Sequence, residues 1–417
     1  MKINLDEIID PMEGRIVVTH DSSGHPHARF DLQGLPRVDT MLEGQTALGA
    51  LRMTEHLCGI CPVAHHLAGT RALDALSGLP PIAPAAQLTR RLLHYGSIVE
   101  AHSLRFLMQN RDAGVALKRI SKKMLIAAGS PGHFPATAVP GGVSVWPTTP
   151  ALCDLSTDLA AARDLAERLC DSALASPPET VTTGDFTGAD VALIDADGNP
   201  DVFGTRVRVT RGTSTADEFD FSLWNERVTE EIPGSPAPQP YLNAAGPEKG
   251  LYRVGPVAQL SIGTLPTPRA AAAQERWLAG ARDAAGARAI ITLHVLERTE
   301  ALVQQLTQLV EGSDLGELVD PATVQFTPGS GTGLVDGPRG ILAHTYTIGA
   351  DGTIQAARIL TPTAQNEPWL AQLLTQAYAL DQAQQTGAWE QSIREADPCL
   401  PISSAPAGQM GLKVENV

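Results

Sequence analysis

Apolar residues recur every three or four positions along four long stretches of the chain, a period that predicts amphipathic α-helices. One stretch begins near Ala47, one spans residues 86–109, one spans residues 152–169, and one runs from about 270 to 312. We expect the last helix to break at Gly286, because glycine is a poor helix former. The apolar stripe of the second stretch consists of Leu88, Leu92, Tyr95, Val99, His102 and Phe106.

Short runs of β-branched and aromatic residues lie between these helical stretches and predict strands. Two such runs occupy residues 16–19 and 28–32 near the N-terminus. From about 178 to 250 the sequence becomes β-like and rich in loops, with an Asp197-Gly198 pair that is typical of a hairpin turn. Helical spacing returns after this segment, so the pattern as a whole predicts a helix-rich α+β fold.

Charge and composition exclude several classes of function. The 417 residues carry a formal net charge of -15, which argues against binding to a phosphate backbone. No run of 18 apolar residues occurs, so we expect no membrane span, and we see no signal peptide at the N-terminus. Five scattered cysteines do not make a disulfide framework. Free thiols in a reducing cytoplasm fit this composition best.

Two cysteine-containing stretches carry the chemistry. The first is Cys58-Gly-Ile-Cys61, followed by His65. A Cys-x-x-Cys turn places two thiolates on one metal, and the glycine lets the backbone bend tightly. The second stretch, Asp397-Pro398-Cys399, lies near the other end of the chain.

Together the two stretches resemble the active-site motifs of the large subunit of nickel–iron hydrogenases. That family carries R-x-C-G-x-C-x-x-x-H near its N-terminus and D-P-C-x-x-C-x-x-H at its C-terminus. The first motif is present here with His56 in place of the arginine. In the second, Cys399 is in place, but Ile402 occupies the position of the fourth cysteine and Ala405 that of the histidine.

Further segments resemble the family in the same order along the chain. Asp336-Gly-Pro338-Arg339-Gly resembles E-A-P-R-G, whose arginine reaches over the metals in the family, and the proline fixes the turn that aims it. Thr363 matches a hydroxyl that hydrogen-bonds a cyanide ligand of the iron. Glu13 matches a glutamate that passes protons to and from the site. Asp39 matches a magnesium ligand, but the histidine that is the second ligand of that ion is missing, so we expect no magnesium.

The resemblance implies one hydrogenase large-subunit-like domain over residues 1–417, with a central helical bundle and a β- and loop-rich insertion at about 178–250. The metal pocket would lie where the two termini meet. A histidine on an apolar stripe is usually a core residue with a hydrogen-bond partner, so we assign His102 no chemistry.

The broken motif changes the implied function. In the family, nickel takes four cysteines, and iron shares two of them and carries one CO and two cyanides. Isoleucine has no lone pair, so Ile402 removes a bridging thiolate, and we do not expect nickel to bind. Cys58 and Cys61 would hold iron, and Cys399 would be a third thiolate. Arg339, on the turn made by Pro338, and Thr363 could still cradle the cyanides by hydrogen bonds.

This pattern resembles the large-subunit-like accessory proteins HupK and HoxV. The resemblance implies a cytoplasmic scaffold, or chaperone, that transiently holds the Fe(CN)2CO unit and passes it to the true large subunit, with hydrogenase maturation proteins as partners. Family precursors are cut after the last histidine of the motif. Because Ala405 replaces that histidine, we expect the tail through Val417 to be retained.

Two other interpretations remain open. The chain could be a divergent hydrogenase or H2 sensor that tolerates a changed ligand, and nickel near one per chain would favour that interpretation. It could instead be a structural protein with zinc on Cys58, Cys61, Cys399 and His65. A metal-free remnant of a large subunit is the weaker alternative, because such a remnant has little reason to keep three of the four thiols.

Overall fold

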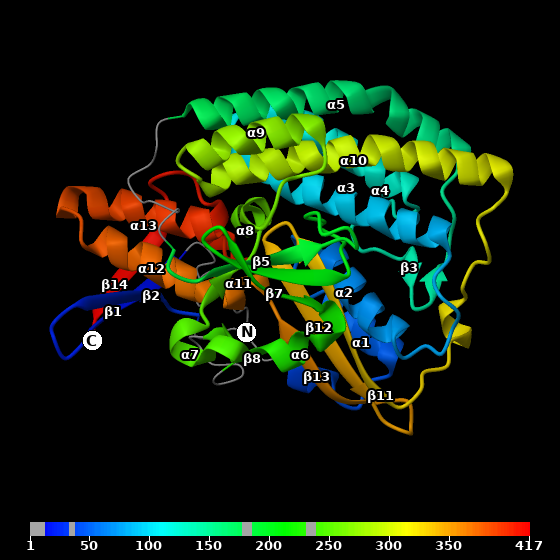
Figure 1. The fold of residues 1–417 in the computed structure, drawn as a ribbon, viewed down its shortest axis with the longest axis horizontal. Helices are drawn as coiled ribbons and strands as arrows, with labels where there is room; N and C mark the ends of the chain where they lie inside the picture. The colour runs from blue at the N-terminus through cyan, green and yellow to red at the C-terminus, as the bar shows by residue number, and fades with distance from the viewer. Residues whose placement is uncertain (1–12, 33–37, 177–185, 231–238) are drawn as a thin grey trace, which may run out of the picture.

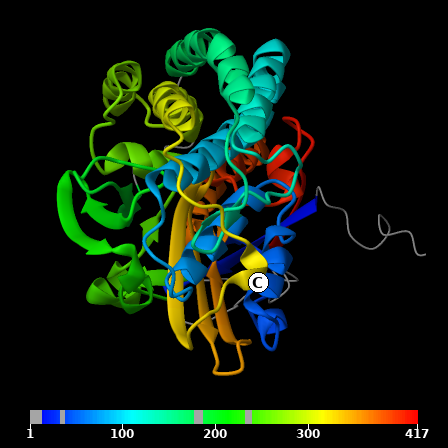
Figure 2. The same ribbon diagram turned by 90° about the vertical axis from the view of Figure 1, so that its right-hand side faces the viewer.

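A computed structural model of the chain describes residues 13–32, 38–176, 186–230 and 239–417. A layer of long helices covers one side of the molecule: α3 (Pro84–Gln109), α4 (Arg111–Ala127), α5 (Thr149–Ala175), α9 (Pro268–Ala279) and α10 (Ala284–Gly312). Figure 1 shows these helices side by side above the sheets, and Figure 2 shows the layer from its end.

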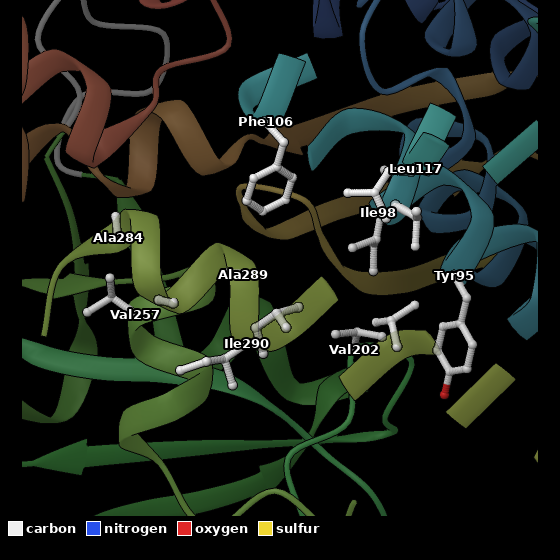
Figure 3. Close-up of a cluster of buried hydrophobic side chains, with 14 of the residues drawn as sticks. Tyr95, Ile98, Phe106, Leu117, Val202, Val257, Ala284, Ala289 and Ile290 are labelled. Atoms are coloured by element: carbon white, nitrogen blue, oxygen red, sulfur yellow. The ribbon is translucent and has the colours of Figure 1, made fainter. Parts of the chain in front are cut away.

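The core between these helices forms as the apolar stripes predict. In Figure 3, Tyr95, Ile98 and Phe106 of α3 and Leu117 of α4 lie across from side chains of α10. All four are almost fully buried. Burial of apolar surface such as theirs is the main favourable contribution to folding. The predicted helices are confirmed, and α3 begins two residues before the expected position.

The expected break at Gly286 is wrong. The break falls at residues 280–283, between α9 and α10, where Arg282 adopts a φ of 56°. Asp283 caps the new helix, because its side-chain oxygen accepts a hydrogen bond from the N–H of Gly286 at 2.5 Å. Gly286 thus lies in the first turn of α10, where a side-chain cap compensates for its weak helix propensity.

A three-stranded antiparallel sheet lies below the helices, in the order β11 (Gly329–Gly337), β12 (Gly340–Ile348), β13 (Ile354–Leu360). Helix α2 (Pro62–Asp74) packs against β11 and β12, and α1 (Ala47–Glu55) precedes it. Gly337 pairs with Gly340, so Pro338 and Arg339 alone form the turn between β11 and β12.

The segment predicted to be β-like contains β5 (Ala189–Ile194), β6 (Arg206–Arg211) and β7 (Ser214–Asp220), joined as antiparallel neighbours. Strand β10 (Tyr252–Arg253), from beyond that segment, pairs in parallel with β5. The hairpin character is therefore confirmed, while the division of the chain into domains stays a prediction. The remaining short elements are β3 (Ala138–Val139), β4 (Gly142–Val143), α6 (Trp224–Arg227), β8 (Val228–Glu230), β9 (Pro240–Leu242), α7 (Gly246–Lys249), α8 (Pro256–Ser261) and α11 (Pro362–Gln365).

The two ends of the described chain share one sheet, in the order β14 (Gly411–Asn416), β1 (Glu13–His20), β2 (Pro26–Phe30). Strand β14 runs parallel to β1, and α12 (Glu367–Tyr378) packs against β2 and α13 (Gln382–Ala396). Figure 1 shows this sheet beside α12 and α13, at the end of the molecule away from β11. The fold is the helix-rich α+β type that the sequence predicts. Among the described residues, no helix is both long and apolar enough to cross a membrane.

Candidate metal centre

The N-terminal cysteine motif is the connection between two helices. Helix α1 ends at Glu55, and Cys61 is the residue before α2, whose first position is Pro62. Proline is favoured there because its missing N–H would have no helical partner. His66 ties the connection down, since its Nδ1 lies 2.9 Å from Glu55 Oε2 and its Nε2 2.7 Å from the carbonyl of Ala138. The motif is therefore fixed on both sides by regular structure.

The C-terminal motif turns sharply at the end of α13. Asp397 follows the helix with φ 46° and ψ 57°, in the left-handed region, and a short 3-10 turn spans Pro401–Ser404. Cys399 lies between these two features. Its backbone N–H donates to Thr363 Oγ1 at 2.9 Å, so the hydroxyl that the sequence singled out holds the third cysteine. The hydroxyl hydrogen of Thr363 stays available to donate elsewhere.

The two motifs bring three thiols together. Cys58 Sγ lies 2.9 Å and Cys61 Sγ 3.9 Å from Cys399 Sγ, and all three sulfur atoms lie within 4.8 Å of one another. Within the described parts of the chain, this is the one group of histidine, cysteine or acidic side chains with metal-binding spacing. Such a set of soft ligands suits iron, zinc or another thiophilic metal.

Hydrogen bonds among the sulfur atoms divide the protons unequally. The contact with Cys399 lowers the pKa of the Cys58 thiol well below its ordinary value. The same neighbour raises the pKa of Cys61, and Cys58 raises the pKa of Cys399 to about 11. One sulfur is thus held as a thiolate while two keep their protons, and a metal that binds all three must displace those protons.

A buried cluster of arginines lies beside the thiols. Arg339 Nε donates to Asp397 Oδ1 at 3.2 Å, Arg105 donates to the same oxygen, and Arg288 Nη1 lies 3.9 Å from Asp397 Oδ2. Burial alone would raise the pKa of Asp397, but these three guanidinium groups, Arg339 foremost, hold it well below its ordinary value. The carboxylate is therefore charged and serves as the centre of the cluster.

Arg339 has donor capacity that its protein neighbours leave unused. Its side chain is 7% exposed, and its Nη1 has no hydrogen-bond partner among the described residues. Burial would lower its pKa, but the charge of Asp397 foremost, and then the neighbouring cysteines of the thiol cluster, raise it, so the guanidinium stays protonated beside the sulfur atoms. A buried donor without a partner is costly, and an acceptor supplied by a ligand would satisfy it.

The turn that carries Arg339 is itself held in place. The carbonyl of Pro338 lies 3.0 Å from His102 Nε2, and His102 Nδ1 lies 2.9 Å from Thr292 Oγ1. Burial lowers the pKa of His102 to about 4, so it is neutral at physiological pH and acts through hydrogen bonds alone. His102 is thus a buried, partnered histidine, as the sequence predicts, and it supports the Pro338–Arg339 turn.

Ile402, at the position of the fourth cysteine, belongs to the hydrophobic core. Its side chain is 1% exposed and lies in the same apolar cluster as Phe30 and Cys61. Ala405 is buried as well, and its carbonyl accepts a hydrogen bond from Arg394 at 3.2 Å. Neither position offers a metal-binding side chain.

Two residues with predicted roles lie outside the thiol cluster. Glu13 begins β1, where its backbone is the register partner of Gly411, and its proposed proton-transfer role stays a prediction. Asp39 lies in a 3-10 turn of residues Asp39–Leu42. Residues 10–12, which precede Glu13 in the sequence, lie outside the described residues.

His65 is directed into a buried chain of hydrogen bonds. Its Nδ1 lies 3.2 Å from His344 Nε2, and His344 Nδ1 lies 2.7 Å from the hydroxyl of Tyr346. Burial lowers the pKa of His65 to about 4. His65 is not part of the group of side chains with metal-binding spacing, so the fourth ligand of the zinc interpretation is not in place.

Sequence reasoning missed Arg105 and Arg288. The sequence did contain a signal for both, because each is a charged residue within an apolar helical segment. Arg105 precedes Phe106, and Arg288 lies among alanines and isoleucines of α10. A buried arginine needs a partner. Its partner, Asp397, could not be identified because it is more than a hundred residues away in sequence.

Comparisons with known proteins agree with this geometry. Residues 37–109 match the family model described as nickel-dependent hydrogenase. The chain is 27% identical to a subunit of the F420-non-reducing hydrogenase of Methanothermobacter thermautotrophicus, over 95% of this chain and 93% of that protein. It is 26% identical to the hydrogenase expression/formation protein HupK of Azotobacter vinelandii, over 80% of this chain and 79% of HupK.

A solved structure agrees as well. The crystal structure of an NAD+-reducing nickel–iron hydrogenase in the H2-reduced state superposes with a TM-score of 0.77 at 27% identity, covering 93% of this chain and 95% of that one. In fold and in sequence, the chain is similar to the large subunits of nickel-dependent hydrogenases.

Proposed function

We propose that this protein is a hydrogenase maturation scaffold that transiently holds an iron unit with one CO and two cyanide ligands, and passes it to a catalytic large subunit. The observation that carries the proposal is an asymmetry. Cys58, Cys61 and Cys399 lie together beside Arg339, while the fourth ligand position is filled by Ile402, a core residue.

The residues present fit such a cargo. Thiolates are soft anionic ligands that suit low-spin iron. Cys58 and Cys61 lie on one short connection, so both thiolates can bind the same iron. Cyanide nitrogen accepts hydrogen bonds, and Arg339 Nη1 is a buried donor without a protein partner among the described residues. Thr363 adds a hydroxyl at the backbone of Cys399.

The missing ligand favours carriage over catalysis. Three thiolates without the second bridge leave nickel an incomplete site, and a site with fewer ligands releases its metal more readily. The similarity to HupK, whose name assigns it to hydrogenase expression and formation, supports the same role. A cytoplasmic location and partners among the hydrogenase maturation proteins follow from this proposal.

A catalytic role is the second candidate, because several relatives are named as hydrogenase subunits. Metal analysis of protein purified anaerobically from its native host separates the candidates. Iron near one per chain with little nickel supports the scaffold. Nickel near one per chain together with H2 uptake supports the divergent hydrogenase and refutes the scaffold. Zinc near one per chain without iron refutes both.

A further inference from the structure

Arg105 contacts the C-terminal motif on both sides of Cys399. It lies near the end of α3 and is 16% exposed. Its Nη2 donates to the carboxylate of Asp397 and, at 2.9 Å, to Ser403 Oγ. Its Nη1 donates to the backbone carbonyl of Ser403. One side chain from a distant part of the sequence thus joins the residue two positions before the cysteine to the residue four positions after it.

A metal bound by two cysteines of one motif holds the segment between them at two points. The contacts of Arg105 hold the segment around Cys399 at two points as well. With Ile402 in place of the second cysteine, a metal can tie this segment at Cys399 alone. The turn around Cys399 includes a left-handed residue, Asp397, and a short 3-10 segment, neither of which is held by a long run of regular hydrogen bonds. Fixed points on both sides therefore decide where the sulfur lies.

We infer that Arg105 is a positioning residue that holds Cys399 at the thiol cluster in the metal-free protein. The chemistry suits this role, because a planar guanidinium with several donors can bind a carboxylate and a backbone carbonyl at once. Hydrogen bonds to charged groups are also stronger than those between neutral groups. Thr363 fixes the backbone N–H of Cys399, and Arg105 fixes the chain before and after it.

The inference deepens the proposed function and rests on it for its biological meaning. A site that keeps its shape without metal binds its cargo without ordering a loop, which lowers the cost of binding. It also releases the cargo without a local rearrangement. A carrier needs both properties, whereas a site assembled by its metal has neither.

Cobalt(II) is a direct probe of the arrangement, because thiolate-to-cobalt charge-transfer absorption grows with the number of sulfur ligands. The metal-free, reduced protein is titrated anaerobically with Co2+ as wild type, Arg105→Gln, Arg105→Lys, Cys399→Ala and the control Arg276→Gln. Arg276 is an exposed arginine of α9 that pairs with Asp171 at 2.7 Å. Its loss removes an ion pair but none of the contacts to the C-terminal motif.

Wild type and Arg276→Gln should show the absorption of three thiolates. Arg105→Gln should lose about one third of it, resembling Cys399→Ala, and bind Co2+ roughly tenfold more weakly, the scale on which supporting residues act at metal sites. Arg105→Lys keeps the charge but not the fork of donors, and its absorption should fall between those of wild type and Arg105→Gln. A general loss of stability would weaken binding without removing one sulfur ligand from the spectrum.

Arg105→Gln with the wild-type absorption and affinity would overturn the inference. If that variant does not fold, Arg105→Lys decides, and wild-type absorption in it would overturn the inference equally. The two claims fail separately. Wild-type protein without CO and cyanide, but with the expected cobalt spectra, would refute iron carriage and leave the role of Arg105 intact.

Discussion

Ile402 packs directly against Gly14, so the position of the missing cysteine contacts the strand that begins the described chain. A Cβ atom on Gly14 would come within 2.5 Å of Ile402 Cδ1 and 2.9 Å of a ring carbon of Phe30. The absence of a side chain at Gly14 is what leaves room for the isoleucine. The fourth ligand position has thus become a packing contact between the two terminal segments.

Ile402→Ala tests whether this position now serves packing alone. The variant should lose ~2–5 kcal/mol of unfolding free energy, the usual cost of such a cavity, as measured by urea unfolding of the metal-free protein. Its cobalt spectrum, taken below the unfolding transition, should keep the absorption of three thiolates. An unchanged unfolding midpoint, or a spectrum that loses a sulfur ligand, would contradict this account.

Arg339→Ala should weaken retention of the iron unit, because it removes the buried donor beside the thiols. The expected loss is ~1.5–3 kcal/mol, the scale of a hydrogen bond to a charged group. Retention is measured as the decay of the cyanide infrared bands during anaerobic dialysis. Arg288→Gln is the matched comparison. Arg288 Nη1 lies 3.9 Å from Asp397 Oδ2, beyond hydrogen-bond distance, so its loss should weaken retention less. Equal decay in wild type and Arg339→Ala would count against a role for this arginine.

Removal of residues 406–417 should destabilise the protein, because the tail is built into the terminal sheet. Strand β14 pairs with β1 over six residues, and the N–H of Val417 donates to the carbonyl of Val18 at 3.0 Å. Glu390 accepts from the N–H groups of Gly408 and Met410. The loss of these hydrogen bonds should cost on the order of a few kcal/mol in urea unfolding. A truncated protein as stable as the full chain would refute this assignment.

Asp336 should make the stability depend on pH. Burial raises the pKa of its carboxyl to about 7, whereas the unfolded value is ~3.9. The folded chain therefore keeps a proton that the unfolded chain releases, so this contribution to stability is full below pH ~4 and lost as the pH rises through 7. Asp336→Asn keeps the shape but cannot ionise.

The difference between the variant and wild type isolates this group, because the buried histidines act in the opposite direction. Burial lowers the pKa of His65, His94, His102 and His294 to about 4, so their contribution is present above ~6.5 and lost as the pH falls through 4. Relative to wild type, Asp336→Asn should gain unfolding free energy between pH 5 and pH 8. A pH-independent difference would show that Asp336 is charged when folded.

Local patterns in the sequence predicted much of the fold, but they did not predict which distant segments pair with each other. The stripe through Leu92 and Val99 located α3 because helix burial follows a short period in the sequence. The position of the break before α10 depended on the cap by Asp283, which compensates for the low helix propensity of Gly286. The parallel pairing of β14 with β1 joins residues about 400 positions apart, and no local pattern specifies such a partner.

The candidate site shows the same division. Resemblance to family motifs identified Cys58, Cys61, Cys399 and Arg339, and the structure brings the three sulfur atoms together. The arginines that surround Asp397 come from three different elements, so their convergence depends on the packing of the whole molecule. Motifs thus name ligands, while the residues that aim those ligands emerge from the tertiary structure.

Infrared spectroscopy of protein purified without oxygen from its native host tests the central claim most directly. Wild type should show one CO band and two cyanide bands, and Cys61→Ala should show none, because a low-spin iron unit needs its thiolate ligands. Cys153→Ala is the control, since Cys153 is an exposed free cysteine outside the thiol cluster, and it should keep all three bands. Wild type without these bands, or Cys61→Ala with full band intensity, would contradict the proposal that this site carries an Fe(CN)2CO unit.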